Sequence, residues 1–184
     1  ARGMAVFLHE WRGIGSSNVR ASRTDDWGYR ELLADLAASQ SVADAQVPGL
    51  RRVLGGHSLG GQMSCCQLGL HPDSADALWL VASGAPYWRV FGAPKRWGLL
   101  SAYRFMRWLA ARNGFMPGRR IGFGGNEARS VIADWARTAI SGHYAAPGVD
   151  VDLEAGMARF GGDVRALTFD QDWLAPPEST AFLT

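Results

Sequence analysis

The sequence lacks the features that would mark a membrane or secreted protein. None of its apolar runs approaches the roughly 18 residues that a membrane-spanning helix requires, and nothing in it reads as a signal peptide. Only two of its 184 residues are cysteines, Cys65 and Cys66, and because they are adjacent they cannot link distant segments. We expect both to pack as small apolar groups in a cytoplasmic protein without a transmembrane segment.

Other absences exclude further classes of function. No cluster of Cys and His has the spacing of zinc ligands, so we expect no metal and no cofactor. The chain has no internal repeat and no low-complexity tract. Its aromatic and basic residues are not accompanied by a known nucleic-acid motif, so we expect no nucleic-acid partner. With 47% hydrophobic and 20% charged residues and a formal net charge of +2, the composition is that of an ordinary single-domain enzyme.

The most informative stretch that is present is Gly-His-Ser-Leu-Gly at residues 56–60. The apolar residues Val53 and Leu54 lead into it as a short strand, and residues 62–70 are compatible with a helix. A sharp turn between a strand and a helix holds a serine hydroxyl clear of its own backbone, where it can act as a nucleophile. The pattern therefore predicts a nucleophile elbow with Ser58 as the nucleophile.

The flanking residues fit the same interpretation. Glycines are expected at Gly56 and Gly60 because a Cβ at either place would collide as strand and helix approach each other. The N–H of Leu59, at the start of the helix, would point at the oxyanion of a tetrahedral intermediate. A phosphate-binding loop would instead need a lysine after its last glycine, where this chain has Gly61 and Gln62.

The remaining pattern alternates strands with helices. Apolar runs predict strands at residues 4–8, 77–83 and 164–169, and an apolar stripe predicts a helix over 27–38, with the aspartates at 25–26 as its cap. Such alternation is typical of a parallel α/β sheet.

A long insertion separates the last two of these strands. Residues 84–163 are rich in aromatic and basic side chains, and helical spacing predicts helices over 97–112 and 126–140. Residues 84–137 hold ten Arg or Lys against two acidic residues. This charge would attract an anionic substrate, an acidic partner or a membrane surface, or it belongs to a solvated helix face without a partner.

Several stretches resemble the α/β-hydrolase fold family. Residues 11–16 are similar to the family's Arg-Gly-x-Gly-x-Ser loop, residues 71–80 to the segment that follows the elbow helix, and residues 169–176 to the turn that carries the catalytic acid. Residues 84–88 and 115–120 resemble a poorly characterised bacterial branch related to serine aminopeptidase-like hydrolases.

The resemblance implies a partial α/β-hydrolase fold, a mostly parallel sheet flanked by helices with a helical cap. Residues 1–83 and 164–184 would form the hydrolase core, and residues 84–163 the cap. The implied activity is hydrolysis of an ester, or of an amide, in a small acyl substrate through an acyl-enzyme. A non-catalytic binding or scaffold module and an acyltransferase are the alternatives.

The resemblance also suggests the catalytic acid. The family's acid stands four residues before a proline, which Asp172 and Pro176 reproduce. Asp172 is therefore preferred to Asp170, although both are also ordinary turn residues. The acid would orient a histidine and stabilise its protonated form.

Two departures from the family predict that the chain is a fragment. If residues 4–8 are the family's fourth strand, then its first three strands, including the one between the fourth and fifth, are missing. The family's histidine follows the acid, and no histidine follows Asp172. His57 lies inside the elbow, His71 at a helix end, and His9 and His143 precede the acid. We expect the histidine to lie outside this chain and the chain alone to be inactive.

Overall fold

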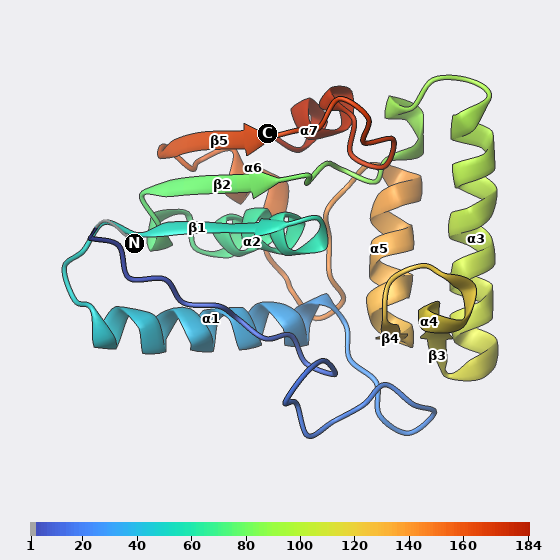
Figure 1. Cartoon of the computed structure of the whole chain (residues 1–184), viewed down its shortest axis with the longest axis horizontal. Coiled ribbons are helices and arrows are strands. Elements are labelled where there is room, and N and C mark those ends of the chain that lie inside the picture. The colour runs from blue at the N-terminus through green and yellow to red at the C-terminus, as the bar shows by residue number, and fades with distance from the viewer. Residues whose placement is uncertain (1–2) are drawn as a thin grey trace.

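The computed structural model describes residues 3–184 and has a three-stranded parallel sheet at its centre. The strands are β1 (Val53–His57), β2 (Ala77–Val81) and β5 (Asp163–Leu167), in the order β1-β2-β5. Helices flank the sheet (Figure 1). The predicted α/β class is confirmed.

The register of the sheet places the ends of the three strands together. His57 lies opposite Val81, and Val81 lies opposite Leu167, so all three strands end at the same edge. In a parallel sheet, the loops that follow the strands meet at this carboxyl edge, which is where such folds bind ligands. The edge therefore gathers the loops that carry the predicted site residues.

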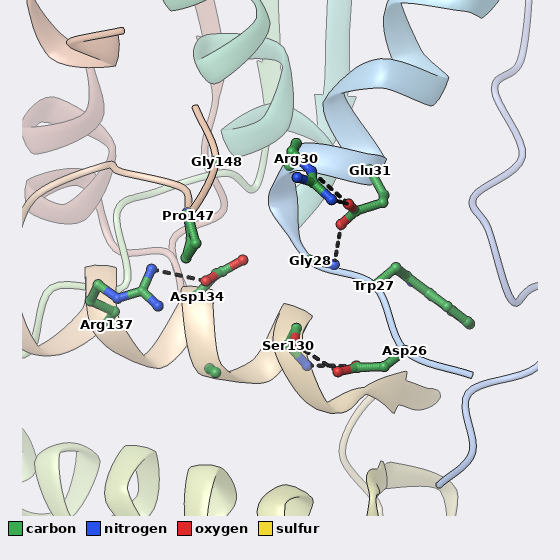
Figure 2. Close-up of a pocket in the computed structure, with 11 residues that line it drawn as sticks. Asp26, Trp27, Gly28, Arg30, Glu31, Ser130, Asp134, Arg137, Pro147 and Gly148 are labelled. Carbon is green, nitrogen blue, oxygen red and sulfur yellow. Dashed lines mark hydrogen bonds and ion pairs between the residues drawn. The ribbon is translucent and has the colours of Figure 1, made fainter. Parts of the chain in front are cut away.

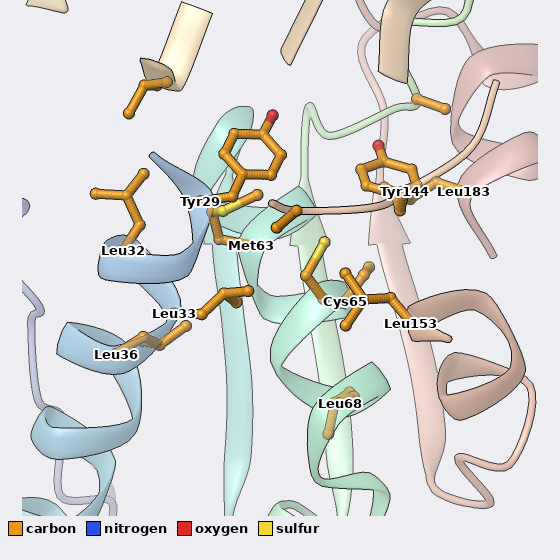
Figure 3. Close-up of a cluster of buried hydrophobic side chains, with 14 of the residues drawn as sticks. Tyr29, Leu32, Leu33, Leu36, Met63, Cys65, Leu68, Tyr144, Leu153 and Leu183 are labelled. Atoms are coloured by element: carbon orange, nitrogen blue, oxygen red, sulfur yellow. The ribbon is translucent and has the colours of Figure 1, made fainter. Parts of the chain in front are cut away.

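The main core lies between the sheet and two helices, α1 (Tyr29–Gln46) and α2 (Leu59–Leu70). The short helix α6 (Leu153–Met157) packs against α2 and adds Leu153 to this core. Figure 3 shows Leu33 of α1 pointing toward α2. Cys65 and Cys66 are buried here as free thiols, and burial raises the pKa of Cys65 to about 12.

The other face of the sheet is open. Trp79 is 45% exposed and Leu167 54% exposed, and Val53 at the start of β1 is 47% exposed. Helix α7 (Pro177–Leu183) packs against the loop that follows β2. The Thr180 hydroxyl donates a hydrogen bond to the carbonyl of Ser83 in that loop.

The segment between β2 and β5 forms a second small core beyond the carboxyl edge of the sheet (Figure 1). Its elements, in chain order, are η2 (Trp88–Val90), α3 (Lys95–Asn113), β3 (Phe115–Pro117), α4 (Gly118–Ile121), β4 (Asn126–Ala128), α5 (Arg129–Ser141) and α6. The long helices α3 and α5 pack against each other, and β3 and β4 form an antiparallel pair at one end of them.

The predicted strand at residues 4–8 is absent. These residues have no regular secondary structure and pair with no strand of the described chain, and Val6 and Leu8 are 70% and 92% exposed. A strand needs a neighbour for its backbone groups, and β1 pairs only with β2. The segment is held instead by His9, whose Nδ1 lies 2.8 Å from the hydroxyl of Ser39 on α1.

Several boundaries also differ from those expected. The helix expected over 27–38 runs on to Gln46 and ends just before Val47-Pro48, because a residue that precedes proline disfavours the helical conformation. The helix expected from residue 126 begins at Arg129, since residues 126–128 pair with β3 as β4. The short η1 (Pro72–Ser74) follows α2.

Candidate active site

The predicted elbow is present between β1 and α2. Ser58 has φ 53° and ψ −123°, a left-handed conformation that a residue with a Cβ rarely adopts. Its N–H donates to the carbonyl of Val81 at 3.1 Å, and its own carbonyl accepts from the N–H of Gly61 at 3.0 Å. Such strain costs on the order of 1–3 kcal/mol and persists only where the surroundings enforce it. The side chain of Ser58 is exposed at the carboxyl edge.

The glycines around Ser58 have different roles. A Cβ at Gly56 would lie 2.4 Å from the carbonyl carbon of Gly60, so the expected close approach of strand and helix is confirmed at this position. The expectation was wrong for Gly60, where a Cβ would meet only the ring of Trp11 at an ordinary 3.9 Å. The second tight contact is at Gly61, whose Cβ would lie 2.2 Å from the hydroxyl of Ser83.

Ser83 supports the elbow from the neighbouring strand. It is 1% exposed, and its hydroxyl donates to the carbonyl of Ser58 at 2.9 Å. The residue before it, Ala82, has φ 43° and donates its N–H to the carbonyl of Leu167 at 2.8 Å. The end of β2 is therefore fixed to both neighbouring strands. Sequence reasoning missed Ser83, because a serine after a strand carries no signal of its own.

Leu59, the expected oxyanion donor, lies at the start of a helix. Leu59 is the first residue of α2, so its N–H has no acceptor within the helix. Successive free N–H groups and the helix dipole make this end of α2 favourable for negative charge. The backbone of Leu59 can therefore donate to an oxyanion that forms beside Ser58.

The two candidate acids differ in how firmly they are held. Asp172 is half-buried, and its Oδ1 accepts from the N–H groups of Leu174 at 2.9 Å and Ala175 at 3.1 Å. Its own N–H donates to the carbonyl of Phe169 at 3.0 Å. Asp170 is exposed, and its carboxylate has no hydrogen bond within residues 3–184. Only Asp172 is therefore oriented by its loop.

Ser58 and Asp172 lie on loops at the same edge of the sheet. Ser58 follows β1 and Asp172 follows β5, with β2 between them. Two strand spacings amount to about 10 Å. Their side chains make no hydrogen bond with each other in the part of the chain that the structure describes.

None of the four histidines hydrogen-bonds to Ser58 in the described structure. His9 bonds to Ser39, and burial lowers its pKa. His143 is exposed and its Nδ1 lies 3.0 Å from the carboxylate of Glu154, which raises the pKa of the imidazole.

The other two histidines adjoin α2 but do not face the nucleophile. His57 ends β1, and strand alternation directs its side chain to the face opposite that of Gly56, which faces α2. His71 is the C-terminal cap of α2, at the far end of the helix from Ser58. Neither can take the proton of Ser58 in this arrangement.

Two aspartates join the core to the α3–α5 pair (Figure 2). Asp26 was expected to cap α1, but it caps α5, accepting from the N–H of Ser130 at 2.9 Å and from its hydroxyl at 2.7 Å. Asp134 on α5 reaches back and accepts from the N–H of Tyr29, the first residue of α1, at 2.9 Å. The segment just before α1 thus supplies a carboxylate to the N-terminal region of α5, and α5 supplies one to that of α1.

A surface pocket of about 440 Å³ lies at this junction. Its charged side chains bond to one another: Arg137 donates to Asp134 at 2.8 Å, and Arg30 donates to Glu31 at 2.7 Å (Figure 2). Ser58, Leu59 and Asp172 are not among its lining residues. The pocket is therefore an ion-paired junction between helices, separate from the elbow.

Within residues 3–184, no three His, Cys, Asp or Glu side chains are grouped so that they could hold a metal ion. No helix of the same residues is long and apolar enough to cross a membrane.

The comparison with known families decides the classification. The family described as serine aminopeptidase, S33, matches residues 1–136, which is most of the chain. The chain belongs to this family. Its fold is that of the α/β-hydrolases, and the resemblance given by the elbow motif is confirmed. No curated protein matches this sequence.

Solved structures of hydrolases are similar to this serine aminopeptidase-family chain. A carboxylesterase structure from Nitrososphaera gargenis superposes with a TM-score of 0.51 at 16% identity, covering 95% of this chain and 66% of that one. A thermostable carboxyl esterase from Bacillus coagulans, in complex with glycerol, gives a TM-score of 0.39 at 13% identity, covering 78% of this chain and 64% of that one. The chain thus spans slightly less than two thirds of either esterase.

Proposed function

We propose that this chain carries the nucleophile and the acid of a serine hydrolase that cleaves an ester, with an amide as the less favoured substrate. The observation that carries the proposal is the left-handed backbone of Ser58 at the junction of β1 and α2. Strain of this kind needs a compensating role, and an exposed nucleophile is the role that this turn serves. The carboxylesterase structure from Nitrososphaera gargenis is consistent with an ester substrate for this chain.

In the proposed mechanism the Ser58 hydroxyl oxygen attacks the carbonyl carbon of the substrate. A histidine that these 184 residues do not supply takes the hydroxyl proton, and Asp172 accepts a hydrogen bond from that imidazole through its free Oδ2. The N–H of Leu59 donates to the oxyanion. The bond to the leaving alcohol then breaks as the alcohol takes the proton, and water hydrolyses the acyl-enzyme by the same steps. We further propose residues 84–163 as the cap that shapes the substrate pocket.

A fluorophosphonate probe tests the nucleophile directly, because it phosphonylates an activated serine without the need for the natural substrate. We expect labelling of the full-length protein, and loss of labelling in Ser58→Ala. Ser101→Ala, which removes an exposed hydroxyl that bonds to the carbonyl of Trp97, is the matched control and should label normally.

The alternatives give different results in the same experiment. A folded full-length protein that does not label would favour the non-catalytic binding module. Labelling with transfer of the acyl group to an added alcohol in preference to water would favour the acyltransferase.

A further inference from the structure

The outer side of α3 combines positive charge with exposed aromatic rings. From Ala77 to Asn126 the chain contains eight Arg or Lys and no acidic residue. Five of these cations belong to α3: Lys95, Arg96, Arg104, Arg107 and Arg112. None of the five forms an ion pair with a carboxylate of residues 3–184. The positive charge of this helix is therefore not neutralised within the described chain.

Three aromatic residues on the same helix are solvent-exposed. Trp97, Phe105 and Trp108 are 53%, 53% and 59% exposed, and the rings of Phe105 and Trp108 stack with their centroids 5.8 Å apart. The opposite side of α3, which includes Tyr103 and Met106, is buried in the core shared with α5. The rings of Phe105 and Trp108 are therefore not required for the packing of α3 onto the protein, whereas the ring of Trp97 also contacts that of Trp88 on η2, with their centroids 5.0 Å apart.

Helical geometry places the charges and rings on one stripe. Successive residues of an α-helix are about 100° apart, so Trp97, Arg104, Phe105, Trp108 and Arg112 lie within an arc of roughly 100°. The stripe faces away from α5, and α3 stands at the outer edge of the molecule (Figure 1). We call this set of five residues the α3 stripe.

We propose that the α3 stripe binds the surface of an anionic lipid bilayer, with α3 lying parallel to the membrane plane. Tryptophan and phenylalanine rings partition to the boundary between headgroups and acyl chains. Arginines beside them would contact the lipid phosphates, to which a guanidinium donates two hydrogen bonds. The complementarity of charge selects an anionic bilayer over a neutral one.

The geometry of the stripe favours a bilayer over other anionic partners. A single convex helix offers little surface to a folded acidic protein, whereas a planar membrane can contact its whole length. Phe105 and Trp108 stack on each other, so they do not present the open ring faces on which successive nucleic-acid bases would stack. The inference does not depend on Ser58 being catalytic.

Docking through this stripe would place the neighbouring loop at the membrane. Lys95, at the start of α3, donates to the carbonyl of Trp173 at 3.1 Å, and its ammonium lies 5.2 Å from the centroid of that ring. The loop of Trp173 is therefore connected directly to the first turn of the membrane-facing helix.

Vesicle co-sedimentation tests the proposal. We expect the protein to sediment with vesicles of phosphatidylcholine and phosphatidylglycerol but not with phosphatidylcholine alone, and high salt should release it. Arg104→Gln with Arg112→Gln should weaken binding about 25-fold, at roughly fivefold for each charge near the surface. Arg159→Gln with Arg165→Gln removes two exposed arginines elsewhere and should change binding much less.

The aromatic contribution is measured separately. Phe105→Ser with Trp108→Ser should weaken binding tenfold or more, whereas Val42→Ser, at an exposed apolar position on α1, should not. In the unmodified protein, brominated acyl chains should quench tryptophan fluorescence. This measurement does not depend on the folding of any variant.

Equal binding to neutral vesicles, unchanged binding of either α3 double variant, or absence of quenching would overturn the proposal. So would a dimer in gel filtration that Trp108→Ser converts to a monomer, or nucleic acid that competes with the vesicles at lower concentration.

Discussion

The hydroxyl of Ser83 donates a hydrogen bond of 2.9 Å to the backbone carbonyl of Ser58, joining the end of β2 to the strained turn after β1. Ser83 is buried, so water cannot replace it as the donor. Together with the bond from the N–H of Ser58 to Val81, it fixes the elbow from the neighbouring strand. The orientation of the proposed nucleophile therefore depends on a residue 25 positions away in the sequence.

Ser83→Ala should destabilise the protein and impair its proposed catalysis. The Ser58 carbonyl keeps its bond from the N–H of Gly61, so losing the hydroxyl should cost about 0.5–1.5 kcal/mol. A freer elbow should lower kcat more than it raises KM. Ser41→Ala is the control, because it removes a hydroxyl that donates to a backbone carbonyl four residues earlier on an exposed helix surface. Urea unfolding and ester turnover measure both effects. Equal results for Ser83→Ala and Ser41→Ala would contradict this role.

The two glycines of the motif should respond in opposite ways to alanine. Gly56→Ala would place a Cβ 2.4 Å from backbone, which cannot rotate away, and should cost about 3 kcal/mol or more. Gly60→Ala has room beside Trp11 and lies within α2, where alanine is favoured over glycine by up to about 1 kcal/mol. The thermal midpoint should fall in the first variant and stay level or rise in the second. A similar fall of the thermal midpoint in both variants would show that neither position can accommodate a Cβ.

The parts of the fold that could be predicted from the sequence are those specified locally. The elbow was predictable because residues 56–60 encode both the tight turn and its exposed serine. β2 was predictable because its apolar run packs against α2. The prediction of a strand at residues 4–8 was wrong because an apolar run becomes a strand only beside a partner strand. Pairing depends on the rest of the sheet, which the run does not encode.

The junction between the helices could not be predicted for a related reason. An aspartate just before a helix is the usual sign of a cap, which is why Asp26 was assigned to α1. Its real partner, Ser130, lies 104 residues further along the chain, and the carboxylate that serves α1 comes from Asp134. The role of Ser83 could not be predicted for the same reason, since its hydrogen bond to the elbow forms only when β1 and β2 pair.

The contribution of Asp26 to stability should depend on pH. Burial alone would raise the pKa of Asp26, but its hydrogen bonds with Ser130 and Arg129 outweigh burial and hold the pKa below its ordinary value. A lowered pKa in the folded state means that the stabilisation is full above the unfolded pKa, about 3.9, and is lost as the pH falls through the folded value.

Asp26→Ala should therefore lower the free energy of unfolding by about 1–2 kcal/mol at pH 7, as loss of a helix cap does. The difference from the unmodified protein should shrink as the pH falls below about 4. Urea unfolding at a series of pH values measures it. A difference that stays constant down to pH 2 would mean that the charge of Asp26 makes no contribution.

The choice of acid can be tested by two matched substitutions. In Asp172→Asn the amide oxygen can still accept from the N–H groups of Leu174 and Ala175, so the loop should keep its shape while losing its charge. That charge would stabilise the protonated histidine and select its tautomer, and the comparable change in serine proteases lowers kcat by about 10⁴. Asp170→Asn removes an exposed charge two residues away and should change kcat less than threefold, about 0.6 kcal/mol. Turnover of an activated ester by the full-length protein, with circular dichroism as a check of folding, separates the two. A larger loss in Asp170→Asn would make Asp170 the acid, and equal, small losses would remove the acid from this loop altogether.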